Sequence, residues 1–176
     1  MKIKIMAIIC ALSFMLSAML TAADITMYHI PGYYRYQFEN HEVLGDLNRN
    51  MDMKNALYAF DEMMEYLRGN RDNLNIEITA DGAWQEFYNA REKAHLKDVR
   101  NIVLKACRLR LIAALICLIS LIYIMTHCNR HQSAWVSIRK TFVATCIITN
   151  AAFLLIVGVA AVNFDKAFMI FHRVLF

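Results

Sequence analysis

Residues 109–125 read Leu-Arg-Leu-Ile-Ala-Ala-Leu-Ile-Cys-Leu-Ile-Ser-Leu-Ile-Tyr-Ile-Met, and this apolar run decides the fold class. It is about 17 residues long, enough for a helix to cross most of the roughly 30 Å hydrocarbon core of a bilayer. Two similar runs flank it, at about Ile5–Ala23 and Phe142–Val162. The 176 residues are 59% hydrophobic, and their mean hydropathy of +0.35 lies above the usual soluble range. We therefore predict a mainly α-helical protein with three transmembrane helices.

The first run has two interpretations. Lys2 and Lys4 precede it, and Thr21-Ala22-Ala23 resembles a signal-peptide cleavage site. The run is long for a signal peptide, however, and two further spans follow it. We expect an uncleaved signal anchor, with the first transmembrane helix at residues 1–23.

The charged residues predict an orientation. All 15 acidic residues except Asp165 lie between Asp24 and Asp98. The N-terminus and the short second loop are basic, which is typical of cytoplasmic segments. Residues 24–101 are therefore expected outside the cytoplasm, although three basic residues at the outer end of the second span oppose this: Lys105, Arg108 and Arg110.

The long segment 24–101 reads as a small α+β domain. Tyr28–Val43 is aromatic and favours β structure, with Pro31-Gly32 as a turn. Asn50 or Asp52 can cap a helix that runs to about Leu67, before Gly69-Asn70.

The remaining elements lead into and out of the membrane. Leu74–Ile78 alternates like a short strand, and Asp81-Gly82 forms a turn. A helix that starts near Trp84 is expected to continue unbroken into the second span at 102–126. A cytoplasmic loop at 127–140, a third span at 141–162 and an interfacial helix at 163–176 complete the expected order.

The first candidate site precedes the second span, in Phe87-Tyr-Asn-Ala-Arg-Glu-Lys-Ala-His-Leu-Lys-Asp-Val99. On a helix, Arg91, Glu92 and Asp98 all lie within reach of His95. A carboxylate can fix the tautomer of an imidazole and raise its basicity, which suits a general base near neutral pH. The alternative is a solvated helix face whose ion pairs contribute little to stability.

The second candidate is His172, which lies among phenylalanines. Ionisable groups in such surroundings are costly and often functional. Asp165 precedes it by two helical turns on the same face. The alternative is an interfacial histidine with one side in water.

Other histidines and the cysteines give weaker signals. His127-Cys-Asn-Arg-His131 has the i,i+4 spacing of metal ligands, but an ordinary cytoplasmic loop fits it better, and we expect no metal and no cofactor. His29 and His41 suit core or surface roles. No CxxC spacing is present, and no GxSxG, P-loop, HExxH or GxGxxG motif, so thiol-redox, serine-hydrolase, nucleotide and zinc-protease chemistry lack support. The Tyr33-Tyr-Arg-Tyr36 group could bind lipid headgroups or single-stranded nucleic acid, but its expected place outside the cytoplasm makes nucleic acid an unsuitable partner.

Three stretches resemble the four-span lipoprotein intramolecular transacylases: Tyr66-Leu-Arg-Gly69, the stretch Phe87–Val99 and Phe164-Asp-Lys-Ala-Phe-Met-Ile-Phe-His172. The first is a weak motif, whereas the other two are fairly specific. The resemblance implies a bacterial cell-membrane enzyme that acts on diacylglyceryl-modified lipoproteins. It would move the sn-2 acyl chain to the α-amine of the N-terminal cysteine, forming a lyso-form lipoprotein. Membrane lipid would be the enzyme's second partner. His95 and His172 match the family's two functional histidines. The family continues with an Asn-Asp-x-Trp-like stretch and a fourth span, whereas this sequence ends at Phe176.

Two other classes remain open from the sequence. One is a non-catalytic accessory or sensor protein whose outer domain binds a partner. The other is a membrane haem protein that uses histidine pairs, which the lack of a mid-span histidine disfavours.

Overall fold

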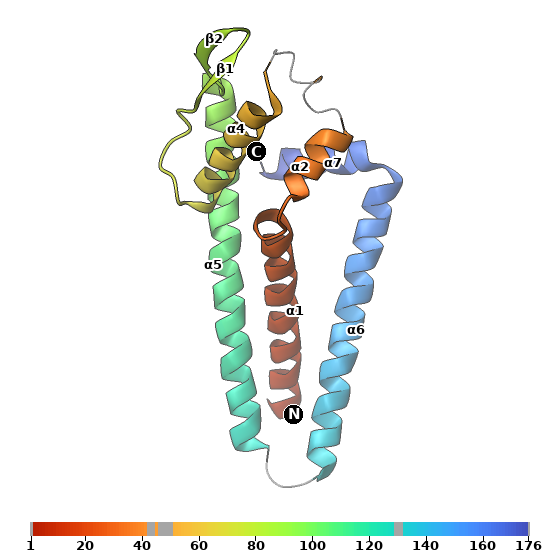
Figure 1. Ribbon diagram of the computed structural model, residues 1–176. Helices are drawn as coiled ribbons and strands as arrows, with labels where there is room; N and C mark the ends of the chain where they lie inside the picture. Colours follow the sequence, from red (N-terminus) through yellow and green to blue (C-terminus); the bar gives the residue numbers. More distant parts are fainter. Residues whose placement is uncertain (1, 42–44, 46–50, 129–131, 176) are drawn as a thin grey trace. The chain divides into compact units, whose positions relative to one another are not determined.

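The computed structural model describes residues 2–41, 45, 51–128 and 132–175 (Figure 1). The chain forms two compact units, one made of residues 1–21 and 108–176 and the other of Ala22–Cys107. We call them the membrane unit and the outer unit. The elements in chain order are α1 Lys2–Tyr28, α2 Tyr33–Asn40, α4 Met53–Arg68, β1 Glu77–Ala80, β2 Ala83–Glu86, α5 Ala90–His127, α6 Gln132–Val162 and α7 Phe164–Leu175.

The membrane unit is built on three long apolar helices. Along the described chain, α1, α5 and the segment Ala134–Val162 of α6 are long and apolar enough to cross a bilayer, which confirms the three-span prediction. Small residues line the contact between α1 and α5, and the Sγ atoms of Cys10 and Cys117 are 3.9 Å apart. Small side chains let membrane helices approach closely. Most other large side chains of these helices are apolar and exposed, as expected for surfaces that face lipid.

The outer unit has its own hydrophobic core. Its centre is formed by Ile76 and Ile78, each 1% exposed, with Leu67 and Tyr66 of α4 packed in the same cluster. Leu74, Ile76 and Ile78, whose alternation predicts a short strand, are all buried. The regular strand, however, starts later than predicted, at Glu77.

Helix α4 has both of the predicted end signals. The Asp52 carboxylate accepts a hydrogen bond of 2.8 Å from the backbone N–H of Asn55, which satisfies one of the free donors at the helix start. Gly69 ends the helix at φ 91°, in the left-handed region that glycine occupies without strain. Asn50 lies outside the described residues.

The expectation of a helix from Trp84 is wrong. Asp81 and Gly82 both have positive φ, 54° and 77°, and they connect two antiparallel strands in which Ala80 pairs with Ala83. A two-residue Asp-Gly turn of this kind matches the twist of a hairpin. Trp84 therefore lies on β2, and α5 begins only at Ala90. From there it continues unbroken into the second span, as predicted.

The expectation of β structure in Tyr28–Val43 is also wrong for the part that is described. Tyr33–Asn40 forms α2, directly after Pro31-Gly32. Tyr34 and Phe38 lie one turn apart and both contact the ring of Phe60, with ring-centroid distances of 4.4 and 5.5 Å. This shared aromatic contact favours the helix over an extended strand.

Residues 127–140, for which a cytoplasmic loop is predicted, contain the end of one helix and the start of the next. Helix α5 ends at His127, and α6 begins at Gln132, so most of that stretch is helical. At the other end of α6, Asn163 accepts a hydrogen bond of 3.1 Å from the backbone N–H of Lys166 and so caps α7. The predicted terminal helix at 163–176 is thus present as Phe164–Leu175.

Candidate functional site

The N-terminus of α5 carries a reciprocal pair of hydrogen bonds. The backbone N–H of Glu92 donates to the Asn89 side-chain oxygen, and the N–H of Asn89 donates to the Glu92 carboxylate, each at 2.9 Å. This is a capping box, which satisfies two backbone donors and places a negative charge at the positive end of the helix dipole. It fixes the start of the helix one turn before His95.

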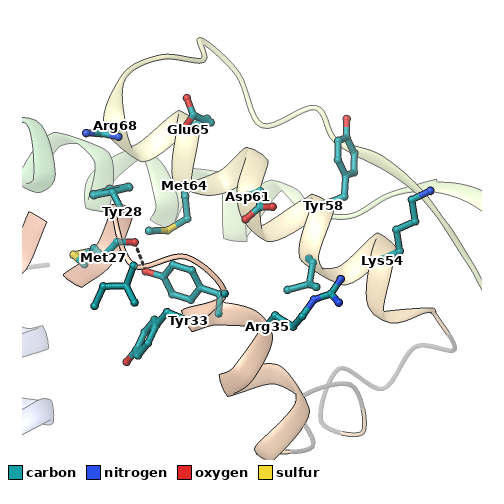
Figure 2. Close-up of a pocket in the computed structure, with 14 residues that line it drawn as sticks. Met27, Tyr28, Tyr33, Arg35, Lys54, Tyr58, Asp61, Met64, Glu65 and Arg68 are labelled. Carbon is teal, nitrogen blue, oxygen red and sulfur yellow. Dashed lines mark hydrogen bonds between the residues drawn. The ribbon is translucent and has the colours of Figure 1, made fainter. Parts of the chain in front are cut away.

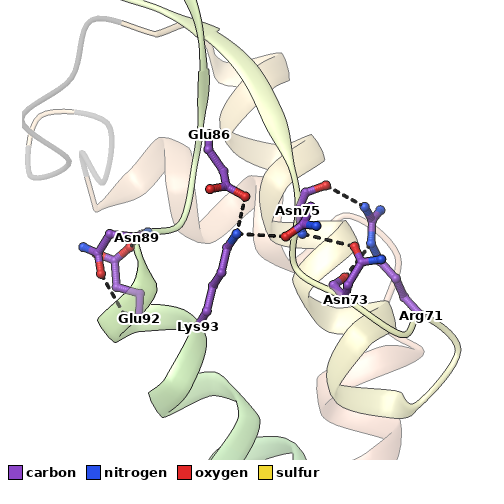
Figure 3. A network of polar contacts seen from close by, with 7 residues as sticks. All are labelled: Arg71, Asn73, Asn75, Glu86, Asn89, Glu92 and Lys93. Atoms are coloured by element: carbon purple, nitrogen blue, oxygen red, sulfur yellow. Dashed lines mark hydrogen bonds and ion pairs between the residues drawn. The ribbon is translucent and has the colours of Figure 1, made fainter.

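A polar network holds the same helix end to the rest of the outer unit (Figure 3). Lys93 forms an ion pair with Glu86 of β2 and donates a hydrogen bond of 2.9 Å to the side chain of Asn75. Arg71 donates to the backbone carbonyls of Asn73 and Asn75 at 2.8 and 3.0 Å. The hairpin and the preceding loop are therefore tied to the first turns of α5.

His95 lies on the exposed side of α5. The side chains of Arg91, Glu92, His95 and Asp98 are all exposed, whereas Leu96 packs against the core of the outer unit. The helix places the other three at positions i−4, i−3 and i+3 relative to His95, as their spacing required. Because the Glu92 carboxylate caps the helix, Asp98 is the carboxylate better placed to orient His95.

His172 belongs to a row of rings on α7. Phe164, Phe168 and His172 follow one another at four-residue spacing, and neighbouring ring centroids are 6.0 Å apart. The phenylalanines are exposed, so the row offers a largely apolar face with an imidazole at one end. Asp165 lies in the first turn, about 10 Å from His172 along the axis. His95 is in the outer unit and His172 in the membrane unit, and their meeting stays a prediction.

A cavity of about 560 Å³ lies in the outer unit, between α2, α4 and the end of α1 (Figure 2). Four tyrosines contribute to it, namely Tyr28, Tyr33, Tyr34 and Tyr58. The Tyr34 hydroxyl donates to the carbonyl of Met27 at 2.7 Å. We call this feature the tyrosine cavity.

Charges of both signs line the tyrosine cavity. The Arg68 guanidinium lies 4.9 Å from the centre of the Tyr28 ring, in a cation–π contact, and its Nη2 is 3.2 Å from His29 Nε2. Asp61 and Glu65 lie one turn apart on α4. Partial burial, together with the Glu65 charge, raises the pKa of Asp61. Two stretches singled out in the sequence contribute to the lining, Tyr66-Leu-Arg-Gly69 through Arg68 and Tyr33-Tyr-Arg-Tyr36, but neither predicted a cavity.

His127 and Cys128, the described residues of the possible metal-ligand stretch, lie at the end of α5. The ring of His127 stacks on Tyr123 with a centroid distance of 4.2 Å, and Cys128 is buried, while His131 lies outside the described residues. Within the described ranges, no three histidine, cysteine or carboxylate side chains converge as metal ligands.

Comparison with family models matches residues 8–176 to lipoprotein intramolecular transacylase Lit. The chain belongs to this family. The match covers both candidate histidines, most of the first candidate span and all of the other two. This transacylase family is one of membrane acyltransferases that act on lipoproteins, so the enzyme class predicted from the sequence is confirmed.

A solved structure shares the transacylase fold. It is an in meso structure of the membrane integral lipoprotein intramolecular transacylase Lit from Bacillus cereus, in a variant with one histidine changed to arginine. The TM-score is 0.70 at 20% sequence identity, over 99% of this chain and 70% of the other. A search of curated proteins gave no match. The likeness confirms a multi-pass membrane fold for this family member.

Proposed function

We propose that the chain moves the sn-2 acyl chain of a lipoprotein's diacylglyceryl group to the α-amine of its N-terminal cysteine. The amine nitrogen attacks the ester carbonyl, the new amide C–N bond forms, and the ester C–O bond breaks. The amine loses a proton, and the glycerol oxygen takes one up. The products are an N-acylated lyso-form lipoprotein and no free fatty acid.

The reaction suits a site without a covalent nucleophile. Because the amine and the ester belong to one molecule, holding them in contact supplies a high effective concentration. The protein then has to remove a proton from the amine, stabilise the charge on the carbonyl oxygen and return a proton to the leaving oxygen. Two imidazoles can perform these steps, so the lack of a serine or cysteine nucleophile motif is consistent with the chemistry.

His95 is the proposed general base, with Asp98 orienting it and Arg91 and Glu92 as further supporting residues. The helical phase of α5 supports this assignment. His95 lies about five, seven and eight whole turns before Ala113, Ser120 and Ile124, and so falls within roughly 20° of their line. Those three are the buried residues of α5. His95 is itself exposed, and it lies on the line of α5 that is buried against protein, not exposed to lipid, farther along the helix.

His172 is the proposed donor to the ester oxygen, with Asp165 as its supporting residue. Its place at the end of an apolar ring row suits the interface of a bilayer, where aromatic side chains are enriched and where ester groups of lipids lie. The proposal requires His95 and His172 to face one cleft, with room for one substrate head between them.

The orientation follows from the same proposal. The N-terminus lies in the cytoplasm of a bacterial cell membrane, and residues 24–101 lie outside, where they meet lipoproteins anchored in the outer leaflet. The diacylglyceryl lipoproteins and the surrounding lipid are the proposed partners. Nucleic acid has no role on this side.

Mass spectrometry of lipoprotein N-termini tests the function directly. Cells that express the chain should contain a lipoprotein with one acyl chain on the cysteine nitrogen and one on the glycerol, and cells without it should not. Release of the sn-2 acyl chain as free fatty acid would contradict an intramolecular transfer.

A further inference from the structure

The tyrosine cavity lies at the surface end of a membrane helix. Met27 and Tyr28 are the last two residues of α1, and both line the cavity. Since about 20 residues of a helix cross the hydrocarbon core, the end of this 27-residue helix reaches the polar layer. A cavity that starts there opens where the polar part of a membrane-anchored molecule lies.

Its size and lining fit an extended polar chain with mixed side chains. A volume of about 560 Å³ falls within the range of sites for small ligands. Tyrosines supply both apolar contact and hydrogen bonding at a low entropic cost, as they do in peptide-binding surfaces. Leu57 and Met64 add apolar wall, and charges of both signs are present.

The mixed charges of the lining favour a peptide over a lone lipid phosphate as the occupant. Three basic side chains and two carboxylates line the cavity: Arg35, Lys54, Arg68, Asp61 and Glu65. Asp61 and Glu65 both line the cavity and would repel a phosphate. Arg68 is already engaged with the Tyr28 ring and His29. A peptide can use both kinds of charge. Its backbone N–H groups donate to the two carboxylates, and its carbonyl oxygens accept from Arg35 and Lys54.

We propose that the tyrosine cavity binds the peptide segment that follows the lipidated cysteine of the lipoprotein. This rests on the proposed function, since it assigns the cavity to the same substrate. The segment lies in the cavity while the diacylglyceryl cysteine is at the histidines. The acyl transfer itself needs no group of the cavity.

Two substrates separate this role from catalysis. One is diacylglyceryl-cysteine amide, and the other is the same molecule extended by five neutral Ser and Gly residues. With the purified full chain in lipid, Tyr58→Ala and Asp61→Asn should each raise KM for the extended substrate about tenfold and leave kcat unchanged. Neither change should alter KM for the amide.

A matched variant controls for loss of an exposed tyrosine. Tyr36 lies on α2, is 62% exposed and is not among the residues of the cavity, so Tyr36→Ala should leave both KM values unchanged. An equal rise for both substrates in the Tyr58 and Asp61 variants would assign the cavity to the shared lipid head, and would overturn the peptide proposal. Unchanged KM values in these variants would overturn it as well.

Cross-linking distinguishes a failure of the cavity assignment from a failure of the proposed transacylase function. A photoreactive group on the second residue after the cysteine should attach to Met53–Arg68 or to Tyr33–Asn40. Attachment elsewhere would overturn the cavity assignment even if the product forms. Attachment at these helices without any lyso-form product from the wild-type chain would instead count against the transacylase mechanism and support the cavity.

Discussion

Asn89 and Glu92 exchange two hydrogen bonds of 2.9 Å at the start of α5. The pair lies one turn before His95 and fixes the first turn of the helix that carries it. The same contact occupies the carboxylate of Glu92, which the sequence alone had placed among the partners of His95. Within the stretch Phe87–Val99, Glu92 thus holds the helix end, while Arg91, His95 and Asp98 face solvent.

The capping box predicts a local stability effect. Asn89→Ala removes the side-chain acceptor for the Glu92 N–H and should lower the unfolding free energy of the outer unit by about 1 kcal/mol. Thermal unfolding in detergent, followed through the exposed Trp84, measures this. Asn101→Ala on the exposed face of the same helix is the control and should be neutral. Equal losses in both variants would show that the cap contributes nothing of its own.

Removal of the proposed base should abolish the reaction. His95→Ala should reduce the rate of lyso-form product formation by about 10²–10⁴-fold at normal protein level, since that is the usual contribution of a general base. Mass spectrometry of the product and immunoblotting of the chain measure the two quantities. His127→Ala, at the far end of α5, is the matched control. Full activity of the His95 variant would mean that His95 and the charged residues around it form only a solvated helix face.

The second histidine should act as a hydrogen-bond donor. His172→Ala should slow the reaction by about 10²–10³-fold, the usual cost of losing one donor to a developing oxyanion. His172→Asn, which keeps a donor, should recover part of the rate. Because both histidines act in one step, the double variant with His95→Ala should be little slower than the worse single variant. Multiplicative losses would indicate separate roles.

The orientation has a direct test. Gly69 ends α4 in the outer unit, so an alkaline phosphatase fusion at this position should be active, and a cytoplasmic reporter there should be silent. A fusion after His127, at the end of α5, should give the opposite pattern. The reverse result would place His95 in the cytoplasm and would exclude contact with exported lipoproteins.

Tyr88 predicts a dependence of stability on high pH. Burial raises its pKa above the usual value near 10, because the tyrosinate would lose solvation. Its favourable contribution to folding is thus complete below about pH 10 and is lost as the pH rises towards the folded-state pKa. Tyr88→Phe should make the decline in unfolding free energy between pH 9 and 11 shallower. Tyr36→Phe, at an exposed site, should leave the slope unchanged.

Long periodic elements were predictable from the sequence. The three apolar runs, the Asp52 cap, the Gly69 stop and the absence of Gly or Pro between Ala90 and Gly158 are local signals, and each acts through the backbone of its own helix. The helix α5 could therefore be extended correctly from Phe87–Val99 into the membrane.

Short elements of the outer unit were not predictable in this way. Residues 33–40 are aromatic enough for a strand, and only the contact of Tyr34 and Phe38 with Phe60, far along the chain, selects the helix. The hairpin did have a local signal in Asp81-Gly82, which was identified as a turn but not as the connection of two strands. The tyrosine cavity is assembled from two separate stretches, residues 27–35 and 54–68, so no single stretch of sequence encodes it.

The unbroken course of α5 also restricts how this region can change during evolution. Inserting or deleting one residue between His95 and Leu109 would leave the helix intact but rotate His95 by about 100° relative to the membrane segment. A loop absorbs such a change, whereas a continuous helix transmits it to every residue before it. Insertions and deletions in relatives that keep the reaction should therefore be rare in this stretch and common in the loops.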